Sequence, residues 1–346
     1  MPNNEISATR KTNITQRKSP PLGRFSSSRR VKITFAILVL WHALFLLNIL
    51  PVKRAFFPIV WLTYIWFVDS VIYKRTGQSL YRTGRRKLLL LVPCSLYFWL
   101  VFELYNIVLK NWEYVMVPDI LPVRWLGYMV CFSTVLLAMF ETARLFDILG
   151  MFKSSRVRPL SGSRGWYGPF VLAGVFSLVS PLIWPKVFFP FIWVGFTFLL
   201  EPLNHALGGV SIMRQREGGS LRTLWLLLAS GAACGLLWEV WNYWAITKWA
   251  YVYPAVIWLK IFEMPVLGYI GFPLFGVESY VMMNTVYLSF HKFHWESPEP
   301  APAFRRPILI AVAGILLLIL CFGVFHLIDR YSVLSFHPSE IRFRVR

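Results

Sequence analysis

Long apolar segments recur along the whole chain and constrain its fold more than any other feature. A helix needs about 20 apolar residues to cross the hydrocarbon core of a bilayer. Only 15% of the residues are charged and 57% are hydrophobic, whereas soluble domains carry roughly 25% charged residues. We therefore predict an all-α, polytopic membrane helical bundle. Its nine expected transmembrane helices are residues 33–50, 56–73, 88–110, 125–146, 170–184, 187–208, 223–246, 264–290 and 307–327.

The basic residues lie mainly between these segments. A net charge of +20 in a soluble protein would suggest nucleic-acid binding. Here the loops 74–87, 152–169 and 214–222 carry much of it, which is the pattern of cytoplasmic loops facing anionic lipid. We predict an integral protein of the cytoplasmic membrane, with its N-terminus in the cytoplasm, the lipid bilayer as a partner and no nucleic acid. The basic tail with Arg342, Arg344 and Arg346 then falls outside, so the topology of the last helix stays open.

The cysteines give no sign of disulfides or zinc. Cys94, Cys131, Cys234 and Cys321 all lie inside apolar segments, and none forms a C-x-x-C pattern. We predict no metal and no cofactor. The first 32 residues are basic and rich in serine and proline without a short apolar core and cleavage site, which indicates a disordered cytoplasmic tail and not a signal peptide.

Two apolar segments contain the same acidic pattern, which indicates an internal duplication. Glu103 and Asn106 lie three residues apart, as do Glu239 and Asn242, so each pair shares one helix face. A W-x-Y pattern and then a proline follow both copies. Further matches extend the alignment: Phe56-Phe57-Pro58, Trp61 and Asp69 with Phe188-Phe189-Pro190, Trp193 and Glu201; Gly77–Leu80 with Gly218–Leu221; Gly127-Tyr128 with Gly268-Tyr269; and Glu141 with Glu278.

The duplication predicts the domain organisation. Each half has four predicted helices, and an even number of spans gives two parallel repeats related by an axis along the membrane normal. A binding site is expected at their interface. The predicted parts are a disordered tail (1–32), a first four-helix membrane repeat (33–150), a basic cytoplasmic linker (151–169), a second four-helix repeat (170–290), a loop (291–306), and a C-terminal transmembrane helix with its tail (307–346).

Carboxylates inside apolar segments are the candidate catalytic groups. A charged side chain at the bilayer centre costs about 2.5–3.5 kcal/mol, so an intramembrane acid is taken as functional by default. Half two offers the fullest set, and we expect it to converge in one pocket as a proton donor with its relays. A hard metal is the weaker interpretation, because no E-x-x-H or H-x-x-x-H pattern is present. The catalytic candidates are Glu201, His205, Glu239, Asn242 and Glu278.

A second group of residues is expected to bind the substrate. Tryptophans deep in the second acidic helix can line a slot for an apolar polyene and stabilise a developing carbocation by cation–π attraction. Trp249 and Tyr251 lie where an interfacial aromatic belt is also expected. For Glu141, an ion pair with Arg144 three residues later is an equally good interpretation. The substrate-binding candidates are Trp238, Trp241, Trp249, Tyr251, Glu103, Asn106 and Glu141.

The order of these motifs resembles the lycopene cyclase-type membrane repeats of bacteria and fungi. Those repeats have a helix with W-[DE], a segment similar to G-x-W-x-[FY]-x-P, and a helix with P-L-E-E. Leu237-Trp238-Glu239, Lys248–Tyr251 and Gly271–Leu274 follow that layout, over roughly residues 56–147 and 187–285. The chain departs from it after Pro273-Leu274, where Phe275-Gly276 replaces the two acids. The resemblance implies a related fold more than the same reaction.

The leading functional hypothesis is a membrane enzyme that acts on a long apolar isoprenoid or carotenoid by proton transfer from a carboxylic acid, as a cyclase or isomerase does. Glu239 or Glu278 would donate the proton, while Asn242 and His205 orient or relay it. The alternative is a proton-coupled transporter or a lipid-handling protein, because parallel repeats with buried acids suit transport equally well. A third interpretation is a scaffold whose acids only pair polar groups between helices. The sequence leaves the substrate and the oligomeric state open.

Overall fold

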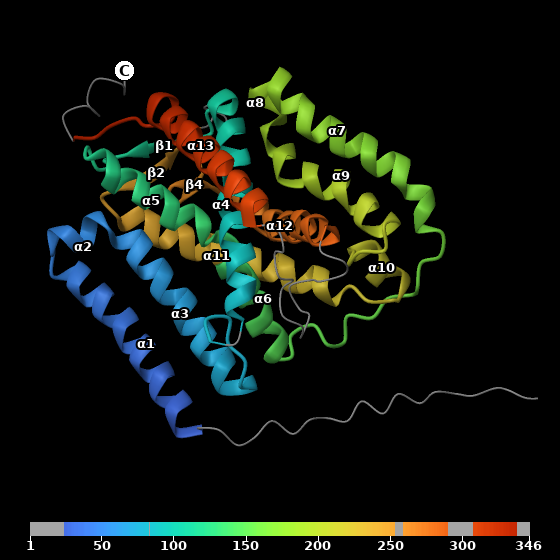
Figure 1. Cartoon of the computed structure of the whole chain (residues 1–346), viewed down its shortest axis with the longest axis horizontal. Coiled ribbons are helices and arrows are strands. Elements are labelled where there is room, and N and C mark those ends of the chain that lie inside the picture. The colour runs from blue at the N-terminus through green and yellow to red at the C-terminus, as the bar shows by residue number, and fades with distance from the viewer. Residues whose placement is uncertain (1–23, 83, 253–258, 290–306, 338–346) are drawn as a thin grey trace, which may run out of the picture.

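The computed structural model describes residues 24–82, 84–252, 259–289 and 307–337, and in these ranges the chain is a bundle of α-helices with two short antiparallel ribbons (Figure 1). The helices are α1 (Arg24–Leu46), α2 (Leu50–Arg54), α3 (Phe56–Thr76), α4 (Arg85–Leu109), α5 (Leu121–Ser133), α6 (Val135–Ile148), α7 (Tyr167–Ile183), α8 (Pro185–Phe188), α9 (Ile192–Ala206), α10 (Ile212–Glu217), α11 (Arg222–Trp244), α12 (Gly271–Leu288) and α13 (Pro307–Tyr331). The strands are β1 (Trp112–Val115), β2 (Lys248–Tyr251), β3 (Lys260–Ile261) and β4 (Met264–Pro265), and the 3₁₀ turns are η1 (Ser163–Trp166), η2 (Phe189–Phe191) and η3 (Val266–Ile270).

Eight helical segments of the described part are long and apolar enough to cross a membrane, so the chain is an integral membrane protein. They are Phe56–Thr76, Lys87–Leu109, Leu121–Ile148, Ser163–Ile183, Pro185–Ala206, Arg222–Trp244, Val266–Leu288 and Gly314–Tyr331. The first predicted span, 33–50, is not among them. Residues 33–46 of it lie in α1, and Leu50 already begins α2. α1 packs on α3 and carries Arg29, Arg30 and Lys32 in its first half, so only its second half is largely apolar.

Several predicted boundaries are corrected by local signals. α1 begins at Arg24, inside the segment predicted as a disordered tail. α5 begins at Leu121 rather than at 125, because Pro122 stands in its first turn, where the missing N–H costs nothing. α3 ends at Thr76, and the next residue, Gly77, has a φ of 71°, a conformation that favours glycine. Residues 1–23, the loop 291–306 with its histidines, and the arginines of the C-terminal tail lie outside the described residues.

The ribbon of β1 and β2 joins the two halves. Its register pairs Trp112 with Tyr251 and Tyr114 with Trp249, on either side of the central pair of Glu113 and Ala250. Residues that match in the duplication therefore exchange places across the ribbon, which is the pattern that a two-fold axis requires. The sequence predicted an interfacial aromatic belt at Trp249 and Tyr251 and gave no sign of strand pairing.

A buried acid holds the turn after the corresponding helix in each half. The Ser79 hydroxyl and the Leu80 amide donate to Asp69, at 2.6 and 2.7 Å. In half two, the Met213 amide donates to Glu201 at 2.7 Å. A serine follows each acid at the same spacing and accepts a backbone N–H: the Ser79 hydroxyl accepts from Arg82, and the Ser211 hydroxyl accepts from Arg214. The true repeat is therefore Ser79 with Ser211, and the predicted match of Gly77–Leu80 with Gly218–Leu221 was wrong.

Close helix crossings hold the bundle together. α11 packs on both α12 of its own half and α6 of the other half. At the first crossing, a Cβ on Gly231 would lie 2.3 Å from the Phe272 carbonyl oxygen, and one on Gly276 would lie 2.5 Å from the Leu227 oxygen. Small residues at these positions let the backbones approach, as is usual between membrane helices.

The C-terminal helix α13 is bound to half one by an ion pair. Arg124 forms a bidentate ion pair with Asp329, from Nε at 2.8 Å and from Nη2 at 2.9 Å. After α13, the chain continues along β1, where the Tyr114 amide donates to the Ser332 oxygen and the Leu334 amide donates to the Tyr114 oxygen. Figure 1 shows α13 crossing α4, with α5 beside it, while α7 and α9 lie on the side of the bundle opposite α1.

Candidate functional site

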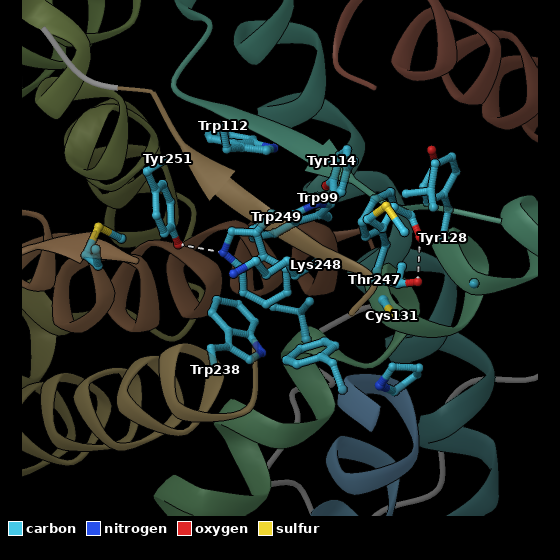
Figure 2. A pocket seen from close by; sticks show the side chains of 18 of the residues that line it. Trp99, Trp112, Tyr114, Tyr128, Cys131, Trp238, Thr247, Lys248, Trp249 and Tyr251 are labelled. Carbon is cyan, nitrogen blue, oxygen red and sulfur yellow. Dashed lines mark hydrogen bonds between the residues drawn. The ribbon is translucent and has the colours of Figure 1, made fainter. Parts of the chain in front are cut away.

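An aromatic cavity of about 1080 Å³ lies between the two halves. Its walls include residues that match in the duplication: Phe57 and Phe189, Trp112 and Trp249, and Tyr114 and Tyr251. The four ribbon residues alternate along β1 and β2, so their side chains point to the same side of each strand. Figure 2 shows these rings with Trp99 and Trp238 around one space.

Tryptophan and phenylalanine rings from α4, α11 and α12 pack against one another beside the ribbon. The ring centroids of Trp99 and Trp238 are 5.6 Å apart, and those of Trp99 and Phe275 are 5.8 Å apart, both edge to face. Phe275 is buried, at 2% exposure. All three residues line the cavity, which makes this wall apolar.

Glu103 accepts hydrogen bonds from three aromatic side chains of half one. Its Oε1 accepts from Tyr114 Oη at 2.6 Å, from Trp99 Nε1 at 2.8 Å and from Trp112 Nε1 at 3.2 Å. The carboxyl group is completely buried. Burial, and then the proximity of Glu103, raises the pKa of Tyr114 well above its usual value, so this phenol keeps its proton and remains a donor.

Each asparagine of the duplicated pattern binds the backbone of the following strand. Asn106 Nδ2 donates to the Trp112 oxygen at 2.8 Å, and its Oδ1 accepts from the Trp112 amide at 3.1 Å. Asn242 makes the same pair of bonds with Trp249, at 2.8 and 2.9 Å. The E-x-x-N spacing thus has a structural explanation, in which the asparagine fixes the strand and the glutamate receives the strand's side chains. Asn242, predicted as a catalytic group, is a positioning residue here.

Glu239 has a similar arrangement in half two. Tyr251 Oη donates to its Oε1 at 2.9 Å, Trp249 Nε1 donates to the Tyr251 oxygen at 3.0 Å, and the Met264 amide also donates to the acid. The residue four before Glu239 is Gly235, whereas Trp99 stands four before Glu103. The Phe272 ring fills the place of a side chain there, only 2.1 Å from where a Cβ on Gly235 would be.

The two units also differ in exposure. Trp112 and Tyr114 are buried, at 5% and 8% exposure. Trp249 and Tyr251 are only half-buried. The acid of half two therefore reaches the cavity through a more accessible phenol than the acid of half one.

Glu201 and His205 lie elsewhere, at the end of α9 that faces α10. His205 contacts the Tyr167 hydroxyl through Nδ1 at 2.5 Å and Glu217 through Nε2 at 3.0 Å. The hydrogen bond from His205 lowers the pKa of Glu217. Neither Glu201 nor His205 lines the cavity.

Glu278 and Glu141 are buried within the helix bundle. The Phe196 amide donates to Glu278 Oε1 at 2.7 Å. Arg144 Nη1 lies 3.7 Å from Glu141 Oε1, as the ion-pair interpretation predicted. Neither acid lines the cavity. Trp241, expected to bind substrate, donates through Nε1 to His42 of α1 at 3.1 Å instead.

The predicted convergence of Glu201, His205, Glu239 and Glu278 in one pocket is therefore wrong. α11 starts next to α10, at the end of the bundle where Glu201 and His205 of α9 also lie. Glu239 comes only near the other end of α11. A helix rises 1.5 Å per residue, so Arg222 and Glu239 are separated by about 25 Å. The structure instead gathers Glu239, Asn242, Trp238, Trp249 and Tyr251 with their half-one counterparts.

Trp99 is the functional candidate that the sequence reasoning missed. It lies four residues before Glu103, on the same helix face, which is a signal that the spacing could have provided. Trp193 was found only as a repeat match, yet it lines the cavity and stacks on Phe102, with centroids 5.2 Å apart.

The fold and the site define an integral membrane protein with an aromatic cavity between two similar halves. Comparisons of the chain with protein-family models, curated proteins and solved structures find no match.

Proposed function

We propose that this protein is an integral membrane enzyme that acts on a long apolar, isoprenoid- or carotenoid-like substrate by carboxylic-acid proton transfer. The observation that carries the proposal is the hydrogen bond between buried Glu239 and Tyr251, whose side chain lines the aromatic cavity. The resemblance to lycopene cyclase-type repeats, with Trp238 and Glu239 in the W-[DE] position, supports a related fold more than the same reaction, so the proposal depends on the site itself.

The cavity suits an apolar substrate. Its volume is at the upper end of the range of about 300–1,000 Å³ that small-molecule sites occupy. Trp99, Trp238 and Phe275 supply ring faces and edges, and ring faces attract a positive charge by about 0.5–2 kcal/mol each. A cation that develops on a polyene would therefore be stabilised beside these rings.

Glu239 and Tyr251 can deliver the proton together. When Glu239 is protonated, it can donate to the Tyr251 oxygen across the same 2.9 Å contact. The phenolic hydrogen is then free to move to an alkene carbon, while the carboxyl proton moves to the phenol oxygen. Loss of a proton from the carbon next to the resulting cation, back to this pair, completes an isomerisation with no other reagent.

We assign the working site to half two and a supporting role to half one. Glu103 Oε1 already accepts three donors, which fix its carboxyl group. Glu239 has the half-buried phenol of Tyr251 between itself and the cavity. In this proposal the halves are parallel four-helix repeats about an axis along the membrane normal, with the N-terminus and the basic loops in the cytoplasm.

The test is expression in cells that accumulate lycopene or other linear polyenes, followed by pigment analysis. We expect new isomers or cyclised products with the unchanged protein and none with Glu239→Gln. Glu217→Gln, at the other end of the bundle, is the matched control and should keep the products. An unchanged pigment profile with several polyenes would count against the enzyme, and proton-dependent flux in proteoliposomes that Glu239→Gln abolishes would favour the transport alternative.

A further inference from the structure

The cavity has a polar rim at the end of the bundle away from α10. The rim includes Arg54 of α2, the loop Met116–Ile120, and Thr247 with Lys248. Hydrogen bonds tie these segments together. The Ile246 amide donates to the Lys53 oxygen at 3.0 Å, and the Thr247 hydroxyl donates to the Met116 oxygen at 2.8 Å. The rim is thus a defined structure at the entrance to an apolar space.

Three cations line the cavity, and two of them are neutralised by carboxylates outside its lining. Arg124 pairs with Asp329 at 2.8 Å, and Lys248 pairs with Glu263 at 2.5 Å. Arg54 is exposed and has no carboxylate within 4 Å among the residues that the structure describes. The acid on the lining is Asp119, whose Oδ1 accepts the Ile120 amide at 2.9 Å.

The surrounding end of the bundle is also basic. Within the described ranges, eight lysines and arginines lie at this end of the bundle, in helix ends, strands and connecting segments, against four acids. The cations are Lys53, Arg54, Lys110, Arg124, Lys186, Lys248, Lys260 and Arg330, and the acids are Glu113, Asp119, Glu263 and Asp329. The excess positive charge attracts an anion to this rim, and the pairing described above leaves Arg54 available to bind it.

We propose that the ligand of the cavity is an amphiphile, with a long isoprenoid tail among the aromatic rings and an anionic head, a phosphate or a carboxylate, at Arg54. This inference rests on the proposed function, since it takes the same cavity as the substrate site and adds the head group. A guanidinium group matches such oxygens because its N–H donors form a planar fork that binds two of them at once.

The test is a titration of the purified full-length protein in neutral detergent, followed by tryptophan fluorescence. The probes are geranylgeranyl phosphate, geranylgeraniol, geranylgeranylamine and inorganic phosphate. We expect the phosphate ester to bind about three- to tenfold more tightly than the alcohol. Arg54→Ala should remove this difference and leave binding of the alcohol unchanged, while Arg54→Lys should restore part of it.

Lys186→Ala is the matched control. Lys186 occupies in half two the position of Arg54, four residues before the proline of the F-F-P motif, but it does not line the cavity. This variant should bind the phosphate ester as the unchanged protein does. Size-exclusion profiles and binding of geranylgeraniol establish that each variant is folded.

Three results would overturn the inference while leaving an apolar cavity ligand in place. They are equal affinity for the alcohol and the phosphate ester, tighter binding of the amine through Asp119, and loss of the phosphate preference in Lys186→Ala but not in Arg54→Ala. Displacement of the ester by inorganic phosphate at the same concentration would show a site for a free phosphate alone, which also overturns it. If no tailed probe binds, the proposed function fails with it.

Discussion

Trp99 and Gly235 stand at the same place in the two halves, each four residues before the buried glutamate of its helix. Trp99 donates to Glu103 at 2.8 Å. Gly235 has no side chain, and the Phe272 ring occupies the space beside it. Glu103 is therefore held by a donor from its own helix, whereas the donors of Glu239 come from Tyr251 of β2 and Met264 of β4.

The first prediction concerns the donor that only half one has. Trp99→Phe keeps a ring in the aromatic wall but removes one hydrogen bond to Glu103. Because a hydrogen bond contributes about 0.5–1.5 kcal/mol, and about 1.5–3 kcal/mol when one partner is charged, we expect a loss of stability of about 0.5–3 kcal/mol. Thermal unfolding in detergent would measure it. Trp166→Phe, at a position with 53% exposure, is the control and should change little. Equal effects of the two changes would refute the donor role of Trp99.

The crossing of α11 and α12 gives the second prediction. Gly231→Ala would place a Cβ 2.3 Å from the Phe272 oxygen, so the helices must separate or shift. Overpacking of this kind costs about 1–3 kcal/mol. The control is Gly323→Ala on α13, where a Cβ meets nothing within 4 Å, and there we expect no loss. Apparent melting temperatures of the two variants, compared with the unchanged protein, decide the point.

The third prediction concerns the attachment of the C-terminal helix. Asp329→Asn leaves buried Arg124 without its carboxylate, and breaking such a pair costs about 3–5 kcal/mol when fully buried and less here, where the Asp329 side chain keeps 13% exposure. The segment after α13 should lose its backbone hydrogen bonds with Tyr114 more readily. Limited proteolysis of this segment would detect the change. A double change, Arg124→Gln with Asp329→Asn, should recover part of the stability. If the double variant is as unstable as the sum of the two single variants, the pair is not coupled.

Prediction from the sequence succeeded where local patterns decide the structure. The spans follow from runs of apolar residues, and the E-x-x-N copies do mark equivalent places. It failed where contacts between distant segments decide. Nothing near Glu113 or Ala250 reveals that these residues pair. The shared pocket of the half-two acids required an arrangement that the separation of about 25 Å between Arg222 and Glu239 along α11 forbids. The match of Ser79 with Ser211 was visible at constant spacing, but Gly218–Leu221 offered a closer literal similarity.

The fourth prediction concerns pH at the end of the bundle near α10. His205 lowers the pKa of Glu217 from its usual 4.5. A group whose pKa is lower in the folded state stabilises that state above the unfolded pKa, and this contribution disappears as the pH falls through the folded value. The melting temperature of the unchanged protein should therefore fall from pH 5 to pH 3 more steeply than that of Glu217→Gln. Parallel curves would contradict the role of this hydrogen bond.

The last prediction separates the two buried acids. Glu103→Ala leaves the Tyr114, Trp99 and Trp112 donors without their acceptor, whereas Glu239→Ala leaves the Tyr251 hydroxyl and the Met264 amide. Because Trp112 and Tyr114 are buried and Tyr251 is only half-buried, Glu103→Ala should lower the melting temperature more. For activity the order reverses. Glu239→Gln and Tyr251→Phe should each reduce product formation by about 10²–10⁴-fold, the usual contribution of a general acid, while Glu103→Gln in folded protein should reduce it far less. The melting temperature in detergent and the turnover of a polyene in liposomes would both be measured on the same preparations of each variant. If Glu103→Gln and Glu239→Gln abolish turnover equally, both halves work, and the assignment of the reaction to half two is wrong.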